Sequence, residues 1–414
     1  MFEIQGKHNT AKVYAETIES EAYAQILELC NQESMKDQSI RLMPDCHAGA
    51  GCTIGTTIHI TNGRIIPNLV GVDICCGVTV AELGDIDIDL EKFDGFIRNN
   101  IPMGFSIRKN GHRFISELTD EKSSYCLRKL RCAKSVNITK GLHSIGTLGG
   151  GNHFIELDTD ESNNKYLVIH SGSRHLGFEV CKYYQNLAYK KLNILSAEAR
   201  GEKDRIISEL KAKGRQREIP EALEKLIKNT KFTSVPKDLT YLEGSDYSDY
   251  LYDMEILQRF ADLNRLAMAD DILKYLNINR DVSIFTTLHN YIDLSRNILR
   301  KGAVSAEEGE KLIIPMNMRD GSLICIGKGN PEWNYSAPHG AGRLMSRSKA
   351  KSSITLKEFQ ESMQGIYSSS VVSSVIDESP MAYKPMEAIT SQIGETVTVQ
   401  KIIKPIYNAK AKES

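Results

Sequence analysis

The amino-acid sequence predicts an α+β fold in which a mixed β-sheet core carries peripheral helices and a helical excursion over residues 178–280. Short β-branched runs alternate with glycines between residues 41 and 83, a pattern typical of strands joined by tight turns. A stretch rich in Lys, Glu, Ala and Leu lies at 177–231 and favours amphipathic helices. The composition, with 41% hydrophobic and 25% charged residues, is that of an ordinary globular protein.

The individual elements follow from these patterns in chain order. The runs TIGTTIHI (53–60), RIIPNLVGV (64–72) and GVTVAEL (77–83) are expected to be strands, and the polar stretch 85–134 is expected to be largely helical. Strands resume around GGGNHFIEL and KYLVIHSGSR. Two or three helices are expected within 177–231, then a helix over 246–276 and a strand in VSIFTTLHN (282–290).

Length and charge limit the classes of function. At 414 residues the chain can form two units or one elaborate unit, since single folds of roughly 250 residues or more occur. Lys and Arg number 52 against 53 Asp and Glu, so a globally basic nucleic-acid coat is excluded and a polyanion site must be a local patch.

The N-terminal segment and the cysteines indicate the compartment. The first 20 residues lack a basic region followed by an apolar stretch, so we expect no secretory signal and a cytoplasmic protein. The longest apolar run is interrupted by Pro67, Asn68 and Asp73, so we expect no membrane span. Nine cysteines in such a chain are expected to be reduced, and one or two could bind metal.

Three histidines stand at the ends of strand-like runs: His153, His170 and His289. Reactive side chains often occupy such places because the sheet is rigid while its edge is open. Asp73 and Cys76 add a carboxylate and a thiol, and this donor set suits a borderline or soft divalent metal such as Zn²⁺, Mn²⁺, Co²⁺ or Fe²⁺. The alternatives are that the histidines are structural and that Cys75 and Cys76 are small buried hydrophobes.

Glycine-rich segments with histidine or arginine suggest a second type of site. LGGGNH, HSGSR and HGAGR allow close backbone approach to a phosphate, and Arg174 and Arg343 supply forked donors, which indicates a nucleotide or phosphoester ligand. His339 precedes a basic segment that includes Arg347, and nearby positive charge favours a neutral, nucleophilic imidazole. Each glycine segment also has the simpler interpretation of a tight turn, and none matches a P-loop.

Two basic clusters could hold a nucleic-acid backbone. They comprise Arg108, Lys109, His112 and Arg113, and Arg128, Lys129, Arg131 and Lys134. Few aromatic residues lie among them, so base stacking there is not indicated.

The motifs MPDCHAGAG, IGTTI, GVDICCGV, LGGGNHFIEL, HSGSR, YLEGSDYSDYLYDM, LHNYID, RKGAVSA and HGAGRLMSRSKAK, in this order, resemble the RtcB family of GTP-dependent RNA ligases. The resemblance implies one catalytic domain over 1–414 with the α+β fold of that family, two Mn²⁺ ions and GTP as cofactor. It implies that Cys76 bridges the metals and that His339 accepts GMP. The implied metal ligands are Asp73, Cys76, His153, His170 and His289.

The resemblance also implies the residues that contact the nucleotide and the RNA. Lys410 matches a lysine that reads the guanine base, and Arg174, Arg343 and Arg347 are expected to bind phosphate or RNA. The other implied nucleotide contacts are Asn152, Glu156, Asn290, Asn317, Ser322, Gly340, Ala341 and Gly342.

The sequence departs from the family pattern around the nucleotide pocket. Met316 and Asn317 stand where Gly and Ser are usual, His175 replaces a glycine, and Pro338 replaces a small polar residue. These changes bear on nucleotide specificity and rate more than on reaction class.

The implied reaction joins an RNA 3′-phosphate or 2′,3′-cyclic phosphate to a 5′-hydroxyl, as in RNA repair or tRNA splicing. The physiological RNA, the need for an activating protein and the oligomeric state are left open by the sequence. Two rival functions remain, a binuclear metallophosphoesterase that needs no nucleotide and a non-catalytic protein that binds RNA ends.

Overall fold

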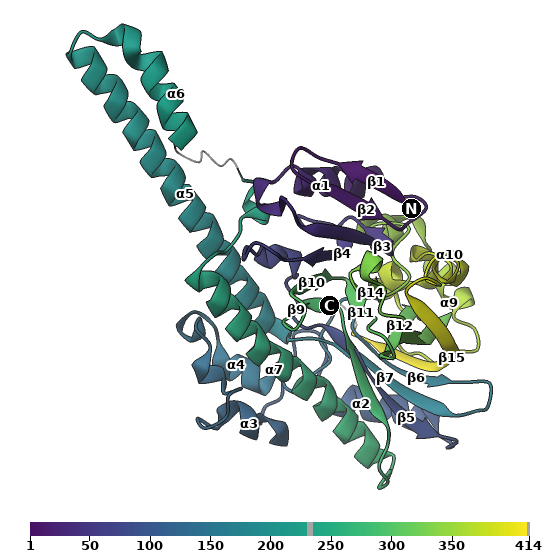
Figure 1. The fold of residues 1–414 in the computed structure, drawn as a ribbon. Coiled ribbons are helices and arrows are strands. Elements are labelled where there is room, and N and C mark those ends of the chain that lie inside the picture. The colour runs from purple at the N-terminus through teal and green to yellow at the C-terminus, as the bar shows by residue number, and fades with distance from the viewer. Residues whose placement is uncertain (230–234, 412–414) are drawn as a thin grey trace.

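The computed structural model describes residues 1–229 and 235–411 and contains two large sheets and a two-stranded one (Figure 1). The six-stranded sheet has the order β1 (Phe2–Gln5), β2 (Thr10–Val13), β3 (Ser39–His47), β4 (Ile54–His59), β10 (Ile298–Lys301) and β9 (Asn290–Asp293). The seven-stranded sheet has the order β12 (Lys311–Asn317), β13 (Gly321–Gly327), β15 (Val397–Lys410), β6 (Phe154–Thr159), β7 (Lys165–Ser171), β5 (Gly77–Gly84) and β8 (Ile284–Leu288). The third sheet pairs β11 (Ala303–Ser305) with β14 (Ser336–Pro338).

Helices surround these sheets, and two of them extend away from the body of the molecule (Figure 1). The 39-residue α5 (Arg174–Ala212) and α6 (Ile219–Asn229) form this projecting hairpin, and by its length α5 is about 58 Å long. The other helices are α1 (Ser20–Cys30), α2 (Leu90–Asn100), α3 (Ser116–Thr119), α4 (Ile138–His143), α7 (Ser245–Tyr275), α8 (Arg347–Ser353), α9 (Leu356–Ser362) and α10 (Met386–Thr390).

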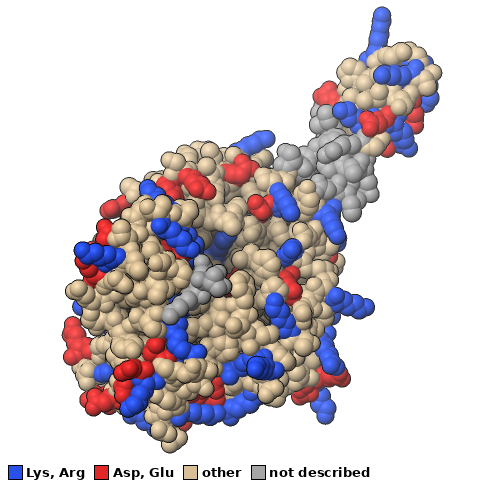
Figure 2. Space-filling model, turned by 180° about the vertical axis from the view of Figure 1, so that it is seen from behind, with Lys and Arg blue, Asp and Glu red and all other residues tan. Residues whose placement is uncertain are grey.

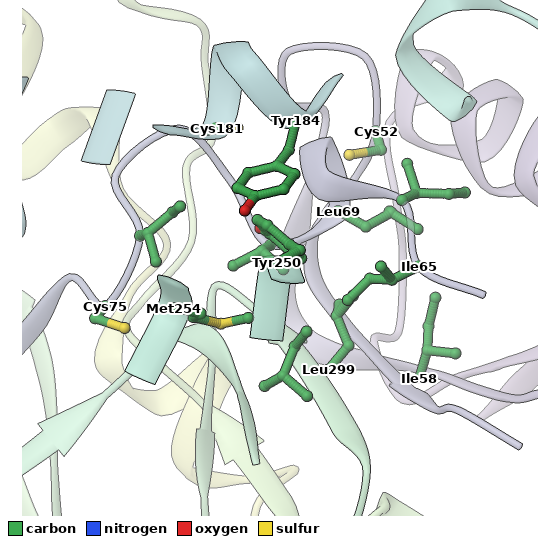
Figure 3. Packing of buried hydrophobic residues seen from close by; sticks show 14 of the residues in the cluster. Cys52, Ile58, Ile65, Leu69, Cys75, Cys181, Tyr184, Tyr250, Met254 and Leu299 are labelled. Carbon is green, nitrogen blue, oxygen red and sulfur yellow. The ribbon is translucent and has the colours of Figure 1, made fainter. Parts of the chain in front are cut away.

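The long helix α7 connects the two main hydrophobic cores. One core lies between α5, α7 and the six-stranded sheet, where Tyr184 of α5 packs edge to face on Tyr250 of α7 with ring centroids 4.9 Å apart (Figure 3). The other core includes Met268 and Ile272 of α7 with residues of α2 and the seven-stranded sheet. Because one helix is buried in both cores, it fixes the two large sheets relative to each other.

Arg265 on α7 shows how this helix also positions loops. Its guanidinium is fully buried and donates hydrogen bonds to the carbonyl oxygens of Cys75 (3.1 Å) and Ser171 (2.9 Å). A buried guanidinium needs such acceptors, so α7 holds the loop before β5 against the end of β7.

The predicted α+β class is confirmed, as are strands in 53–60, 77–83, 154–159, 165–171 and 282–290 and helices in 177–231 and 246–276. The last two positions of the 177–231 stretch lie outside the described residues. The prediction of a strand over 64–72 is wrong. Ile65 makes an isolated bridge and Pro67–Leu69 form a 3-10 turn, because the fixed φ of Pro67 suits the first position of such a turn.

Within the described residues, no helix combines the length and apolarity needed to cross a membrane.

Candidate active site

Five side chains with metal-binding atoms meet at one end of the seven-stranded sheet. Asp73 and Cys76 lie on the loop before β5, His153 directly precedes β6, His170 lies near the end of β7, and His289 directly follows β8. These ends coincide because β5 lies between β7 and β8 and its residue Gly77 stands opposite both Ser171 and Leu288. The prediction that the three histidines lie at strand ends is confirmed.

The donor atoms approach one another closely. His153 Nε2 lies 2.9 Å from Asp73 Oδ2 and 3.4 Å from Cys76 Sγ. His170 Nε2 lies 3.2 Å from the same sulfur and 3.3 Å from His289 Nε2. The cluster therefore contains two triads, one of Asp73, Cys76 and His153 and one of Cys76, His170 and His289, each with its ligand atoms within 4.8 Å of one another. Cys76 belongs to both triads.

Backbone carbonyls fix the orientation of two of the imidazoles. Nδ1 of His153 donates to the carbonyl oxygen of Leu148 (2.9 Å), and Nδ1 of His170 donates to that of Asn152 (3.2 Å). A carbonyl oxygen only accepts, so both Nδ1 atoms carry protons, and the Nε2 lone pair of His170 faces the sulfur of Cys76. This arrangement is usual for metal-ligating histidines. Nδ1 of His289 is buried and has no hydrogen-bond partner among the described residues.

The electrostatic environment keeps Asp73, His170 and His289, but not Cys76, in the forms that can bind a cation. Burial and neighbouring cationic groups lower the pKa of His170 and His289 well below the usual value, so both imidazoles are neutral. Burial alone would raise the pKa of Asp73, but His153 and Arg174 outweigh it and hold this pKa at about 2. Burial and then Asp73 raise the pKa of the Cys76 thiol well above its usual value. The thiolate therefore requires a positive charge at this place, which a metal ion supplies.

Adjacent cysteines have different surroundings. Cys75 is fully buried in the apolar core, where Figure 3 shows it near Met254, and its backbone φ is 57°. Cys76 turns instead to the histidines. The interpretation as a small buried hydrophobe thus applies to Cys75, whereas Cys76 is a candidate ligand.

His339 lies beside this cluster and is held by an acidic side chain that the sequence did not reveal. Its ring centroid is 5.0 Å from that of His289. Its Nδ1 lies 2.6 Å from Oδ2 of Asp45, and the same oxygen accepts from the backbone N–H groups of His339 (3.1 Å) and Gly340 (3.2 Å). Asp45 is fully buried on β3. A carboxylate on Nδ1 directs the lone pair of Nε2 outward, which is the form a nucleophile needs.

A cavity of about 580 Å³ adjoins these groups and is large enough for a nucleotide. His170, His289 and His339 all contribute to its wall. The residues expected to bind nucleotide or phosphate that also line it are Asn152, Glu156, Asn317, Gly340, Ala341, Gly342, Arg343, Arg347 and Lys410.

Three other residues predicted to contact the nucleotide, the phosphate or the RNA do not line this cavity. Ser322 is fully buried on β13, and its hydroxyl has no hydrogen-bond partner in the described part of the chain. Asn290 accepts from the N–H of Gly302 (2.9 Å) and donates to the carbonyl of Asp73 (3.3 Å), so its amide supports the loop that carries the candidate ligands. Neither lines the cavity. Arg174 lies on the Asp73 and His153 side, where it donates to the Gly104 carbonyl (3.1 Å).

The structure also shows the surroundings of three residues that depart from the family pattern. The amide of Asn317 caps a turn, accepting from the N–H of Asp320 (2.9 Å) and donating to its carboxylate (2.8 Å). Pro338 ends β14 next to His339, and Nε2 of His175 lies 3.1 Å from a carboxylate oxygen of Glu179.

Glu378 organises the far wall of the cavity and was also missed by sequence reasoning. It contacts Lys410 (2.9 Å), Arg347 (2.7 Å) and Arg343 (3.4 Å). Burial alone would raise the pKa of Glu378, but Lys410 and Arg347 outweigh it and hold this pKa at about 2.

Glu156 also lines the cavity, but its pKa is shifted in the opposite direction. Burial raises its pKa to about 7, although Asn408 and Lys410 act in the opposite direction.

Four of the seven Lys and Arg residues in the two basic clusters contact neighbouring acids. Arg108 contacts Asp271 (2.6 Å), Arg113 contacts Asp270 (2.5 Å) and Arg128 contacts Glu121 (3.2 Å), while Arg131 lies 3.5 Å from Asp249. Figure 2 shows that both positive and negative side chains lie on the face seen from behind. The binding of nucleic acid by these clusters stays a prediction.

Comparison with known proteins decides the family. The family model described as tRNA-splicing ligase RtcB matches residues 25–411. The chain belongs to the RtcB family. It is 33% identical over 392 residues to the RNA-splicing ligase RtcB of Escherichia coli strain K12, with 87% of each chain covered. It is 28% identical over 436 residues to the tRNA-splicing ligase RtcB of Methanococcus maripaludis, covering 90% of this chain and 88% of the relative.

A third relative is more distant. The tRNA-splicing ligase RtcB of Aeropyrum pernix is 26% identical over 449 residues, covering 87% of this chain and 85% of the relative. The sequence resemblance to the RtcB family is therefore confirmed over nearly the whole chain.

Proposed function

We propose that this protein is an RNA ligase that uses GTP to join an RNA 3′-phosphate, or a 2′,3′-cyclic phosphate opened to it, to a 5′-hydroxyl end. The observation that carries the proposal is the common cavity shared by His339 and the donor cluster. An oriented imidazole, neutral metal-ligand histidines and space for a nucleotide meet there. Membership of the RtcB family supports the same activity.

The donor set fits two divalent ions of the borderline class, with Mn²⁺ as our proposal. The fit rests on two triads that share one sulfur and on the Nε2 atoms of His170 and His289, which lie 3.3 Å apart. Asp73, Cys76, His153, His170 and His289 would hold the metal. A bound metal supplies Lewis-acid stabilisation of the charge on phosphate oxygens.

His339 performs the first covalent step. Its Nε2 attacks the α-phosphorus of GTP, a P–N bond forms, the P–O bond to the β-phosphate breaks, and pyrophosphate leaves with that electron pair. The ring becomes positively charged, and the Asp45 carboxylate at 2.6 Å from Nδ1 stabilises that charge. Arg343 and Arg347, on the cavity wall, offer donors to the phosphates, and Glu156 and Lys410 offer groups that can recognise the base.

Two transfers complete the reaction. An oxygen of the RNA 3′-phosphate attacks the same phosphorus and releases the imidazole of His339, which gives an RNA with GMP on its 3′-phosphate. The 5′-hydroxyl oxygen then attacks the RNA phosphorus, loses its proton, and displaces GMP. A phosphate monoester dianion is a poor electrophile, and attachment of GMP converts an oxygen into a good leaving group.

The test follows protein labelling and RNA sealing separately. The protein is incubated with GTP labelled at the α-phosphate and with Mn²⁺, and intact mass locates the adduct. His339→Ala should lose all labelling, yet still seal RNA that already carries 3′-terminal GMP. His59→Ala, at an exposed histidine on β4, is the matched control and should label normally. Label on another residue, or sealing without GTP, contradicts the mechanism, and hydrolysis of cyclic phosphate without nucleotide would support a phosphoesterase.

A further inference from the structure

The buried carboxylate of Glu378 connects basic side chains on the far wall of the cavity. Glu378 ends the 3-10 turn Ser373–Glu378 and lines the cavity. Its Oε2 accepts from Nζ of Lys410 (2.9 Å) and from the hydroxyl of Tyr383 (2.8 Å), while its Oε1 contacts Arg347 (2.7 Å). Each oxygen has its own partners, so this single carboxylate fixes the ammonium and the guanidinium relative to each other.

The ammonium of Lys410 is held by two acceptors. The lysine is only 3% exposed and lines the cavity. Its Nζ donates to Oε2 of Glu378 (2.9 Å) and to the carbonyl oxygen of Asn152 (3.2 Å). An ammonium has three N–H donors, so within the described part of the chain one donor remains for a ligand. The two acceptors set the direction of that donor.

An aromatic ring and a carboxyl group lie beside Lys410 on the same face of the sheet. The pairing of β15 with β6 places Lys410 opposite Phe154 and Asn408 opposite Glu156. Nζ of Lys410 lies 5.4 Å from the centroid of the Phe154 ring. Phe154 and Glu156 also line the cavity. A ligand at this place therefore meets a cationic donor, a carboxyl acceptor and an aromatic ring.

This combination of groups fits the base of a nucleotide better than its phosphates. An ionised Glu156 would repel a phosphate, whereas a base presents donors and acceptors on one edge and an apolar face. Guanine carries the acceptors O6 and N7, and adenine carries an amino donor in place of O6. The ammonium of Lys410 only donates, so it pairs with O6 of guanine and opposes the amino group of adenine.

We propose that Glu378 is a positioning residue for selection of the nucleobase, because it directs the remaining donor of Lys410 towards the acceptor edge of guanine. This inference rests on the proposed use of GTP and adds to it a residue that acts through another side chain. A lysine has a flexible stem and a compact charge, so its direction depends on fixed acceptors. Glu378 supplies the charged one of the two that hold Lys410.

The experiment measures how well the protein selects GTP over ATP during labelling in the presence of Mn²⁺. KM is measured for GTP labelled at the α-phosphate, and Ki is measured for ATP as a competitor of that labelling. The two nucleotides share their phosphates, so the ratio of Ki for ATP to KM for GTP isolates the contacts to the base. Glu378→Gln should lower this ratio by roughly 10- to 100-fold. A smaller fraction of folded protein would lower kcat and leave the ratio unchanged.

The neighbouring acid provides a matched control. Asp377 is buried in the same turn and contacts Arg347 (2.6 Å) and Lys351 (3.5 Å). Asp377→Asn can change both constants through Arg347, but it should leave their ratio within twofold of the wild type. Glu378→Asp keeps the negative charge and withdraws the carboxylate from Lys410 by one methylene. It should lower the ratio as well, which keeps the test available if Glu378→Gln folds poorly.

A double variant separates action through Lys410 from any other effect of Glu378. Lys410→Met should itself lower the ratio, because it removes the donor that faces the base. Glu378→Gln added to Lys410→Met should then lower the ratio no further, since no ammonium is left to position. Independent effects of the two side chains would multiply instead.

Failure of this inference is distinguishable from failure of the proposed function. If the wild type is not labelled by GTP, the proposed function is wrong. If it is labelled and selects GTP over ATP, but Glu378→Gln and Glu378→Asp leave the ratio within twofold, the inference about Glu378 is wrong. It is also wrong if the double variant shows the product of the two single effects.

Discussion

Asp45→Asn isolates the charge that holds the candidate nucleophile. The amide oxygen can take the place of Oδ2, which accepts from His339 Nδ1 (2.6 Å) and from two backbone N–H groups, so the three hydrogen bonds can persist without the negative charge. The amide nitrogen then takes the place of Oδ1, which is buried and has no partner among the described residues. We expect this buried amide group, which has no acceptor, to lower the free energy of unfolding by about 1–3 kcal/mol, which thermal unfolding would measure.

The effect on labelling with GMP should be larger than a simple loss of stability explains. At an effective dielectric constant of 20, a carboxylate about 4 Å from the charge that develops on the ring contributes about 4 kcal/mol. A charge-assisted hydrogen bond exceeds a neutral one by about 1–1.5 kcal/mol. If these two energies bound the increase in activation free energy, labelling should be roughly 10- to 1000-fold slower in Asp45→Asn.

The assay is single-turnover labelling of the folded variant with GTP labelled at the α-phosphate. Asp37→Asn, at an exposed aspartate before β3, is the control for loss of a negative charge and should label at the wild-type rate. A rate for folded Asp45→Asn within twofold of the wild type would refute the proposed stabilisation of the charged imidazole by Asp45.

Three further predictions concern metal and stability. Cys76→Ser should reduce metal content from two ions per chain to less than one by elemental analysis, because both triads lose a soft ligand, whereas two ions should remain in Cys75→Ser. Glu378→Gln should lower the free energy of unfolding by ~3 kcal/mol at neutral pH. The pKa of Glu378 is about 2 in the folded protein, below its value in the unfolded chain, so the stabilisation by its carboxylate is complete above the unfolded pKa and is lost as the pH falls towards 2. A difference in the free energy of unfolding between the wild type and Glu378→Gln that does not change with pH would contradict this. Asp253→Ala leaves three donors without their acceptor and should cost ~3 kcal/mol or more in denaturant unfolding. Asp249→Ala, at a half-buried aspartate that lies 3.5 Å from Arg131, should cost under ~0.5 kcal/mol, and equal costs would refute the argument.

The candidate donor cluster could be predicted because its chemistry coincides with local sequence signals. His153, His170 and His289 each adjoin a strand-like run, and strand ends at one edge of a sheet meet in space. The family resemblance already implied Cys76 rather than Cys75 as the ligand, and the structure supplies the physical reason. Which of two neighbouring side chains faces the histidines depends on the backbone of a single turn, in which Cys75 has a φ of 57°.

Asp45 and Glu378 could not be assigned from sequence because their partners are distant along the chain. Asp45 is 294 residues from His339, and Glu378 is 32 residues from Lys410. A buried carboxylate is recognisable only through the donors around it, and those donors are assembled by tertiary contacts. The motif MPDCH contained Asp45 but gave no sign of its partner.

The pairing of basic residues with acids indicates how a nearly neutral protein can act on RNA. Cations such as Arg108, Arg113 and Arg128 are paired with acids, so they contribute little long-range attraction for a polyanion. Recognition must then depend on short-range contacts close to the chemistry, where Arg343, Arg347 and Lys410 line the same cavity as His339. Contacts to phosphates carry no sequence information, which would suit an enzyme that recognises the chemistry of an RNA end rather than its sequence.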